Sequence, residues 1–275
     1  MENAKVLYIN QEVYPYVRES REAMVGRYLP QAVQEAGSEI RMFTPRFGCI
    51  NERRNQLHEV LRLSGMNIVI NEADHPLIIK VSSIQAARMQ IYFIDNEEYF
   101  HKKNMLVDKN NAPYADTDEK LIFFARGVLE AIKKLSWIPD IVHCNGWFTS
   151  LVPYYIRKAY RDHPSFLNVK ILTSVFPGKG YDGPMSGDLM ERLRSDKMAS
   201  KELGEKYAPF TYEQLCQFGV DYSDGVVMTE KSANIAPALA KAVTAAKKPT
   251  LTYPGEATFA AACGKFYEKF VPHGK

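Results

Sequence analysis

The amino-acid sequence predicts an α/β fold with a Rossmann-like, doubly wound and mostly parallel sheet. The main observation is that short apolar runs, typical of buried strands, alternate with longer stretches of helical periodicity. A second observation is the length of 275 residues, of which 46% are hydrophobic and 24% charged, as in ordinary globular proteins. Strands and helices that alternate in this way are typical of parallel strands joined by crossover helices.

The first part of the chain is expected to build one half of this sheet. The expected elements are a strand at 6–9, a helix at about 22–35, a strand at 40–46, and strand-like runs at 66–70, 77–82 and 89–94. The last three runs have no helix between them, and antiparallel neighbours can be joined by short turns. We therefore expect a hairpin-rich excursion that rejoins the sheet.

The second part of the chain returns to the alternating pattern. From Thr117 onward, apolar residues recur at helical spacing until Pro139 resets the chain for a strand. The later expected elements are a strand at 140–143, a helix at 147–160, strands at 169–175 and 225–229, and helices at 231–246 and about 256–270. Residues 176–184 hold five Gly or Pro among nine positions, which predicts a loop.

Composition and charge exclude several classes of protein. The net charge of +3 arises from 35 basic and 32 acidic residues, with no basic block that would indicate nucleic-acid binding. No signal-peptide pattern opens the chain, and no apolar run reaches the roughly 18–20 residues of a membrane span. The four cysteines form no CxxC pair, and no residues have metal-ligand spacing. We expect a cytoplasmic protein with no membrane association, no metal and no cofactor.

Four blocks of sequence carry a resemblance to a known family. The first is Lys-Val-Leu-Tyr-Ile-Asn-Gln-Glu-Val-Tyr-Pro-Tyr-Val at 5–17, and the others lie at 92–100, 114–130 and 139–149. In this order, over about residues 4–230, they resemble bacterial glycogen synthases and plant starch synthases. The resemblance implies the N-terminal half of a GT-B fold, whose N-terminal domain binds the α-glucan acceptor. The C-terminal domain of that family binds most of the ADP-glucose or UDP-glucose donor, and glucose is transferred with retention.

The resemblance also predicts the domain organisation. We expect residues 1–248 to form a synthase-like N-terminal domain and residues 249–275 to form a helical C-terminal tail. A donor-binding C-terminal domain is expected to be absent from this chain.

The loop before the first helix departs from the family pattern. Where the family has Lys-Thr-Gly-Gly, which lets backbone N–H groups and a lysine approach the donor diphosphate, this chain has Arg18-Glu19-Ser20-Arg21. Arg18 keeps a positive charge, but Arg21 fills space that glycine leaves open. Glu19 and Glu22 add negative charge near the expected phosphate position. Whether Arg21 blocks the donor site or turns into solvent is left open.

Two further loops depart from the family. The family's His-x-His-Asp-Trp block reads His143-Cys144-Asn145-Gly146-Trp147 here, so the second histidine is an asparagine and the aspartate is a glycine. The block Thr-Ile-His-Asn followed by Tyr-Gln-Gly reads Thr-Ser-Val-Phe at 173–176 and Tyr-Asp-Gly at 181–183. Losing one preorganised polar group typically costs on the order of 10² to 10³ in rate.

The resemblance supplies candidate site residues, and each also has an ordinary structural interpretation. The candidates for catalysis are His143, Asn145 and Asp116; those for substrate binding are Glu12, Tyr16, Arg18, Trp147, Phe148 and Tyr181. His143 could instead be a satisfied buried residue and Asp116 a helix cap. Glu12 could bind the backbone of a neighbouring loop, and the aromatic residues could pack in the core.

Three hypotheses for function follow from these observations. The first is a catalytically degenerate synthase relative that binds α-glucan or maltooligosaccharide, or a partner enzyme, in glycogen metabolism. The second is an active synthase subunit using ADP-glucose or UDP-glucose, with a partner protein supplying the donor domain. The third is a binding module for a nucleotide or small sugar.

Overall fold

The described residues form a ten-stranded sheet. Most of its strands pair in parallel, as the sequence predicts. The computed structural model describes residues 4–102, 104–185 and 187–271, and the strand order is β10-β9-β8-β7-β1-β2-β6-β5-β3, with β4 paired to β5. The strands are β1 (Lys5–Asn10), β2 (Glu39–Pro45), β3 (His58–Glu59), β4 (Met66–Ile70), β5 (Ala73–Ile84), β6 (Met89–Asp95), β7 (Ile141–Asn145), β8 (Lys170–Val175), β9 (Gly225–Met228) and β10 (Thr250–Leu251).

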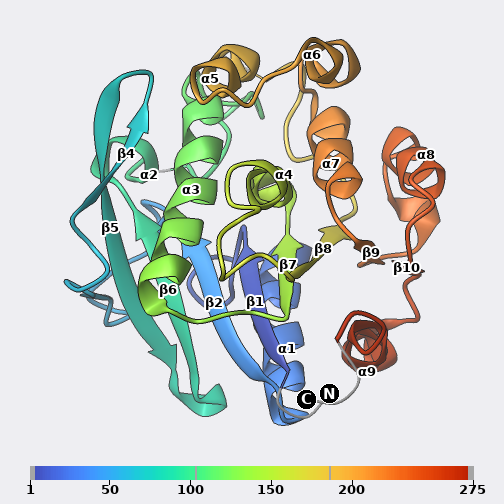
Figure 1. Ribbon diagram of the computed structural model, residues 1–275. Coiled ribbons are helices and arrows are strands. Elements are labelled where there is room, and N and C mark those ends of the chain that lie inside the picture. Colours follow the sequence, from blue (N-terminus) through green and yellow to red (C-terminus); the bar gives the residue numbers. More distant parts are fainter. Residues whose placement is uncertain (1–3, 103, 186, 272–275) are drawn as a thin grey trace.

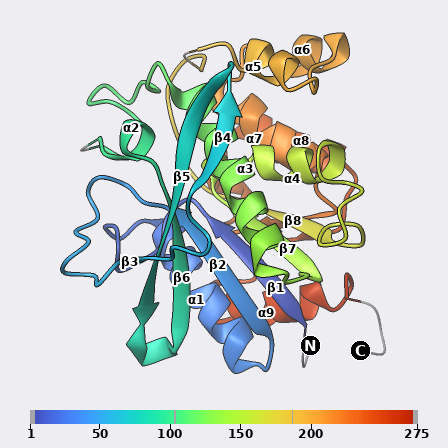
Figure 2. The ribbon, with the colours of Figure 1, turned by 60° about the vertical axis from the view of Figure 1, so that its left-hand side comes forward.

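Helices cover both faces of the sheet (Figures 1 and 2). The α-helices are α1 (Arg21–Glu35), α2 (Glu97–Phe100), α3 (Thr117–Leu135), α4 (Leu151–Lys158), α5 (Leu189–Ser195), α6 (Lys201–Tyr207), α7 (Tyr212–Asp221), α8 (Pro237–Ala245) and α9 (Glu256–Tyr267). Helices α3 and α4 pack together on one face, and α1 and α9 pack together on the other. The predicted doubly wound α/β class is therefore confirmed.

Strand β1 lies in the middle of the sheet and positions the site. It pairs in parallel with β2 on one side and β7 on the other, so that Asn10 is level with Asn145. Its apolar residues Val6, Leu7 and Ile9 are fully buried, as both faces of a parallel sheet require. The chain winds in opposite directions from β1, through α1 to β2 and later through α3 to β7. The sheet's switch point is therefore between β1 and β7, where α/β proteins bind their ligands.

The predicted hairpin excursion is also confirmed. Strand β5 pairs antiparallel with β4 and β6, and β6 returns to the sheet in parallel with β2. The β4–β5 turn consists of Asn71 and Glu72, both with positive φ (49° and 64°). Positive φ at both central positions is typical of a type I′ turn, whose twist matches that of paired strands.

The C-terminal segment lies on the same sheet as the rest of the chain. Strand β10 pairs with β9, and α9 packs on α1. The hydroxyl of Tyr267 on α9 lies 3.1 Å from that of Tyr8 and 2.5 Å from Nδ1 of His143. All three side chains are fully buried. The helix expected at about 256–270 is present as Glu256–Tyr267, and it closes the sheet face above β1 and β7.

Four helices have no counterpart in the sequence analysis. They are the short helices α2, α5, α6 and α7, the last three of which lie between the Gly- and Pro-rich loop and β9. Their start signals are local caps: the side chain of Ser200 accepts from Leu203 N, and Thr211 and Gln214 form a capping box. Among the helices of the described residues, none combines the length and the apolar character that crossing a membrane requires.

Candidate functional site

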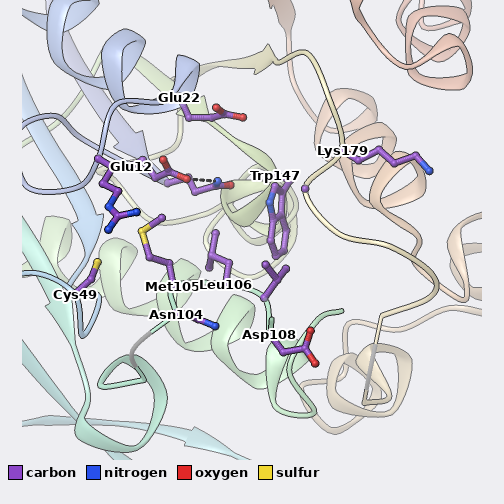
Figure 3. A pocket seen from close by; sticks show the side chains of 13 residues that line it. Glu12, Glu22, Cys49, Asn104, Met105, Leu106, Asp108, Trp147 and Lys179 are labelled. Carbon is purple, nitrogen blue, oxygen red and sulfur yellow. Dashed lines mark hydrogen bonds between the residues drawn. The ribbon is translucent and has the colours of Figure 1, made fainter. Parts of the chain in front are cut away.

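A cavity of about 620 Å³ opens at the carboxyl edge of the sheet, where β1 and β7 end (Figure 3). Its volume is in the usual range for small-molecule sites. Loops that follow β1, β2, β6, β7 and β8 meet there. The lining residues are Gln11, Glu12, Arg18, Glu22, Cys49, Asn104, Met105, Leu106, Val107, Asp108, Trp147, Lys179 and Gly180.

Two carboxyl groups meet at the start of α1: Glu22 lies in its first turn, and Glu12 lies in the loop after β1. Ser20 is the N-cap, and its Oγ accepts from Ala23 N at 2.9 Å and donates to Glu12 Oε2 at 2.6 Å. The close packing depends on Gly26, where an added Cβ would lie 2.2 Å from the carbonyl oxygen of Glu12. Glu12 is thus held against the start of the helix, beside Glu22 (Figure 3).

Glu22 is the most strongly perturbed acid that lines the cavity. Burial, with the charge of Glu12 as the second cause, raises its pKa to about 7. A positive helix end would favour the charged form of an acid in the first turn. At Glu22 burial outweighs this effect of the helix end. Both carboxylate oxygens of Glu12 accept hydrogen bonds, from Gln11 and Ser20.

Trp147 forms the aromatic part of the cavity wall. Its indole is in edge contact with Phe148 and Tyr181, at centroid distances of 5.6 and 4.9 Å. The backbone of Gly180 packs closely against the indole. A Cβ at this position would come within 2.3 Å of the indole Nε1, so the contact requires glycine. Tyr181 donates its hydroxyl to the carbonyl oxygen of Phe210 at 2.6 Å, which fixes the loop behind the indole.

Of the nine predicted site residues, three line the cavity: Glu12, Arg18 and Trp147. Tyr16 instead points into the core, where its hydroxyl donates to Ser82 Oγ at 3.1 Å. Phe148 is buried in an aromatic cluster, and Tyr181 supports Trp147 from behind.

None of the three residues considered for catalysis lines the cavity. His143 is fully buried between the hydroxyls of Tyr267 and Ser174, and burial lowers its pKa to about 3, so it is a neutral core residue. Its place on the α9 face of β7 keeps it out of the cavity wall. Asn145 donates to Asn10 Oδ1 at 2.8 Å, also under the helices of that face.

Asp116 belongs to a separate charged cluster at the start of α3. It lies 2.8 Å from Lys102 Nζ and 2.9 Å from Lys120 Nζ. Lys120 is almost fully buried against the ring of Tyr114, and burial lowers its pKa to about 8 although Asp116 opposes the change. The side chain of Asp116 makes no cap hydrogen bond to the helix.

Arg21 neither blocks the cavity nor points into solvent. Its guanidinium donates to the carbonyl oxygen of Thr229 at 2.7 and 3.1 Å and to Glu256 at 2.6 Å. It also lies over the rings of Tyr253 and Phe259, at 5.3 and 5.5 Å. Arg21 therefore ties the start of α1 to the C-terminal segment.

Sequence reasoning missed several cavity residues. Gln11 and Cys49 belong to loops that follow β1 and β2, and residues 104–108 belong to a loop that follows α2. The position of Gln11 directly after β1 was a signal available in the sequence, whereas Cys49 lies four residues beyond the end of β2. Cys49 is exposed, whereas Cys144, Cys216 and Cys263 are buried, and all four thiols are free. Within the described residues, no group of three or more His, Cys, Asp or Glu is arranged to hold a metal ion.

Comparisons with known proteins point to one family. The family model described as the starch synthase catalytic domain matches residues 5–234. A glycogen synthase of Chlorobium phaeovibrioides is 35% identical over 231 residues, which are 84% of this chain and 46% of the relative. A glycogen synthase of Chlorobium luteolum is 41% identical over 175 residues, which are 63% of this chain and 36% of the relative.

The fold has a solved counterpart. The catalytic domain of starch synthase IV from Arabidopsis thaliana, determined with ADP and acarbose bound, superposes with a TM-score of 0.73 at 16% identity. The match covers 94% of this chain and 52% of that structure. The chain thus spans about half the length, or less, of the relatives it matches.

Proposed function

Since this chain belongs to the starch synthase catalytic domain family, we propose that its cavity binds an α-glucan or maltooligosaccharide, and that the described residues do not transfer glucose by themselves. The observation that carries this proposal is the negative charge at the start of α1. Helix N-termini are favourable sites for phosphates, because their N–H groups and dipole attract anions. Here the chain's own carboxylates occupy that region.

The arrangement at α1 disfavours a diphosphate on electrostatic grounds. The Ser20 side chain already caps the helix, and Glu12 accepts from that same hydroxyl. Glu22 is a second carboxyl in the cavity, and burial raises its pKa to about 7 because its charged form is already costly there. A diphosphate would add further negative charge to the same cavity, and Arg21 is engaged by Thr229 and Glu256 instead of lining it.

A neutral sugar suits the same cavity better. Sugar hydroxyls both donate and accept, so they can bind to the carboxylate of Glu12 and the carboxamide of Gln11 without a charge penalty. The indole of Trp147 offers an aromatic surface of the kind that apolar sugar faces pack against. Acarbose, a ligand of the Arabidopsis starch synthase structure, makes this class of ligand a direct choice for testing.

The test is calorimetric titration of the protein with a linear maltooligosaccharide. We expect saturable binding with a Kd of about 1 mM, equivalent to about −4 kcal/mol. Trp147→Phe should weaken binding about fivefold, because it removes part of the aromatic surface in the wall. Trp137→Phe is the matched control: it makes the same change at a tryptophan that is bonded to Glu39 and does not line the cavity, so affinity should not change. Absence of binding by the wild-type protein at 10 mM sugar would refute the proposal.

Two cationic residues favour a second candidate function. Arg18 and Lys179 line the cavity, and they could contact the diphosphate of ADP-glucose or UDP-glucose in an active synthase whose donor-binding part comes from another chain. The ammonium of Lys179 lies 3.8 Å from Asp182, however, which reduces the positive charge available to a ligand. Tighter binding of ADP-glucose than of maltooligosaccharide, abolished by Arg18→Ala, would favour this candidate over the first.

A further inference from the structure

Gln11 occupies a central position in the cavity wall. It follows β1 directly, and its backbone N–H donates to the carbonyl oxygen of Asn145 at 2.8 Å, which extends the pairing of β1 with β7. Its side chain is almost fully buried and nevertheless lines the cavity. It therefore lies at the sheet's switch point, with its backbone fixed on the β7 side.

The carboxamide of Gln11 joins two parts of the cavity. Its Nε2 donates to Glu12 Oε1 at 3.0 Å, the bond drawn from Glu12 in Figure 3. Its Oε1 accepts from the backbone N–H of Phe148 at 3.1 Å. One side chain thus holds both the cavity acid and the loop that carries Trp147. A carboxamide has two N–H groups and two acceptor positions, and among the described residues each of its two polar atoms has one partner, so one N–H and one acceptor position remain for a ligand.

Gln11 and Gly146 form a sterically matched pair. Gly146 has φ +92°, and an added Cβ would lie 2.6 Å from Gln11 Cβ and 2.8 Å from Gln11 Oε1. Contacts under 3 Å are not tolerated, so a side chain at 146 and the carboxamide of Gln11 exclude each other. The carboxamide fills the space that position 146 leaves open, and it brings a neutral polar group to this part of the cavity.

We infer that Gln11 is a specificity-determining residue of the cavity. Its carboxamide binds neutral sugar hydroxyls through the remaining N–H and the remaining lone pair. The same carboxamide holds Glu12 and the Trp147 loop in place. The inference rests on the proposed function, because it concerns the same glucan-binding site. It adds the residue responsible and the chemical reason for a preference for uncharged ligands.

The test uses Gln11→Glu, which preserves shape but changes chemistry with pH. An ionised Glu at position 11 still accepts from Phe148 N–H but cannot donate, and it repels Glu12; a protonated Glu regains one O–H donor. Like charges side by side favour protonation of one of them. The groups that titrate or carry charge in the same cavity are Glu12, Arg18, Glu22, Cys49, Asp108 and Lys179. All six groups are present in both the wild type and the variant. The ratio of the two proteins' Kd values for the sugar therefore reports the effect of position 11.

The measurement is the Kd for a linear maltooligosaccharide at pH 8 and pH 5, for the wild type and for Gln11→Glu. We expect the variant to bind about tenfold more weakly at pH 8, because a hydrogen bond to the sugar is lost and the acid is displaced. At pH 5 the deficit should shrink to about threefold or less, as protonation restores the donor. Gln90→Glu, on the exposed surface of β6, makes the same charge change and should leave the Kd unchanged.

The outcomes separate the inference from the proposed function. If the wild type binds the sugar and Gln11→Glu binds equally well at both pH values, the role of Gln11 is refuted while glucan binding stands. An affinity deficit that is the same at pH 5 and pH 8 would also refute it, since a purely structural defect does not follow the ionisation of position 11. No binding by the wild type would overturn both.

Discussion

Glu22→Gln should stabilise the protein at alkaline pH and change its stability little at acidic pH. Burial, with the charge of Glu12 as a second cause, raises the pKa of Glu22 from an ordinary 4.5 to about 7 in the folded protein. Between these pH values the folded protein holds a proton that the unfolded chain releases. Stability therefore falls as the pH rises through this window, and above about pH 7 the full penalty is present. Glutamine carries no charge at any pH and removes this penalty.

The magnitude follows from the pKa difference. A change from 4.5 to about 7 corresponds to about 3 kcal/mol. Glu22 is partly exposed, so solvent screening reduces this, and we expect about 1–2 kcal/mol. For a chain of this size, that amount corresponds to about 2–8 °C in Tm.

The assay is thermal unfolding followed by circular dichroism at pH 5 and pH 8.5. The Tm of Glu22→Gln should exceed that of the wild type by about 2–8 °C at pH 8.5 and by about 2 °C or less at pH 5. Glu19→Gln, which changes an exposed acid two residues before α1, controls for net charge. An equal increase at both pH values would refute the reasoning, because the effect would not depend on ionisation. So would no increase at pH 8.5.

Two further predictions concern the packing of the C-terminal segment. Tyr267→Phe removes the hydroxyl that lies 2.5 Å from His143 Nδ1. Because a buried group is left without its partner, the free energy of unfolding measured in urea should fall by about 1–3 kcal/mol. An unchanged urea midpoint and m-value would contradict the buried hydrogen bond. Arg21→Ala removes the hydrogen bonds to Thr229 and Glu256 and should destabilise the protein by about 1–2 kcal/mol. The affinity for maltooligosaccharide, measured by calorimetry, should not change. A changed affinity would mean that Arg21 reaches the ligand.

Local patterns were enough to predict most of the fold. The run 6–9 is continuously apolar, and such runs are typical of strands buried on both faces, which β1 is. The hairpins followed from the absence of helices between strand-like runs, and the loop at 176–184 followed from its Gly and Pro content. Short helices such as α5 and α6 escaped prediction because each spans only seven residues, too few for a clear helical period.

The candidate site was predicted only in part. Glu12 and Trp147 follow directly after strands at the carboxyl edge, so their place in the cavity follows from topology once the strands are known. His143 also ends a β-like run, but it lies on the face that α9 covers, where it is neutral and buried. The pleat decides on which face a strand residue lies, but the tertiary fold decides which helix covers that face, and the sequence around His143 carries no sign of α9.

The amino-acid order alone predicts the α/β class, the order of the main elements and the edge of the sheet where the cavity lies, because these follow from periodicity and short-range turn chemistry. The construction of the cavity depends on long-range contacts. The contact between Gln11 and the Phe148 backbone joins residues 137 positions apart, and the one between Arg21 and Thr229 joins residues 208 apart. Such contacts depend on three-dimensional closure of the sheet and its helices, which no local pattern encodes.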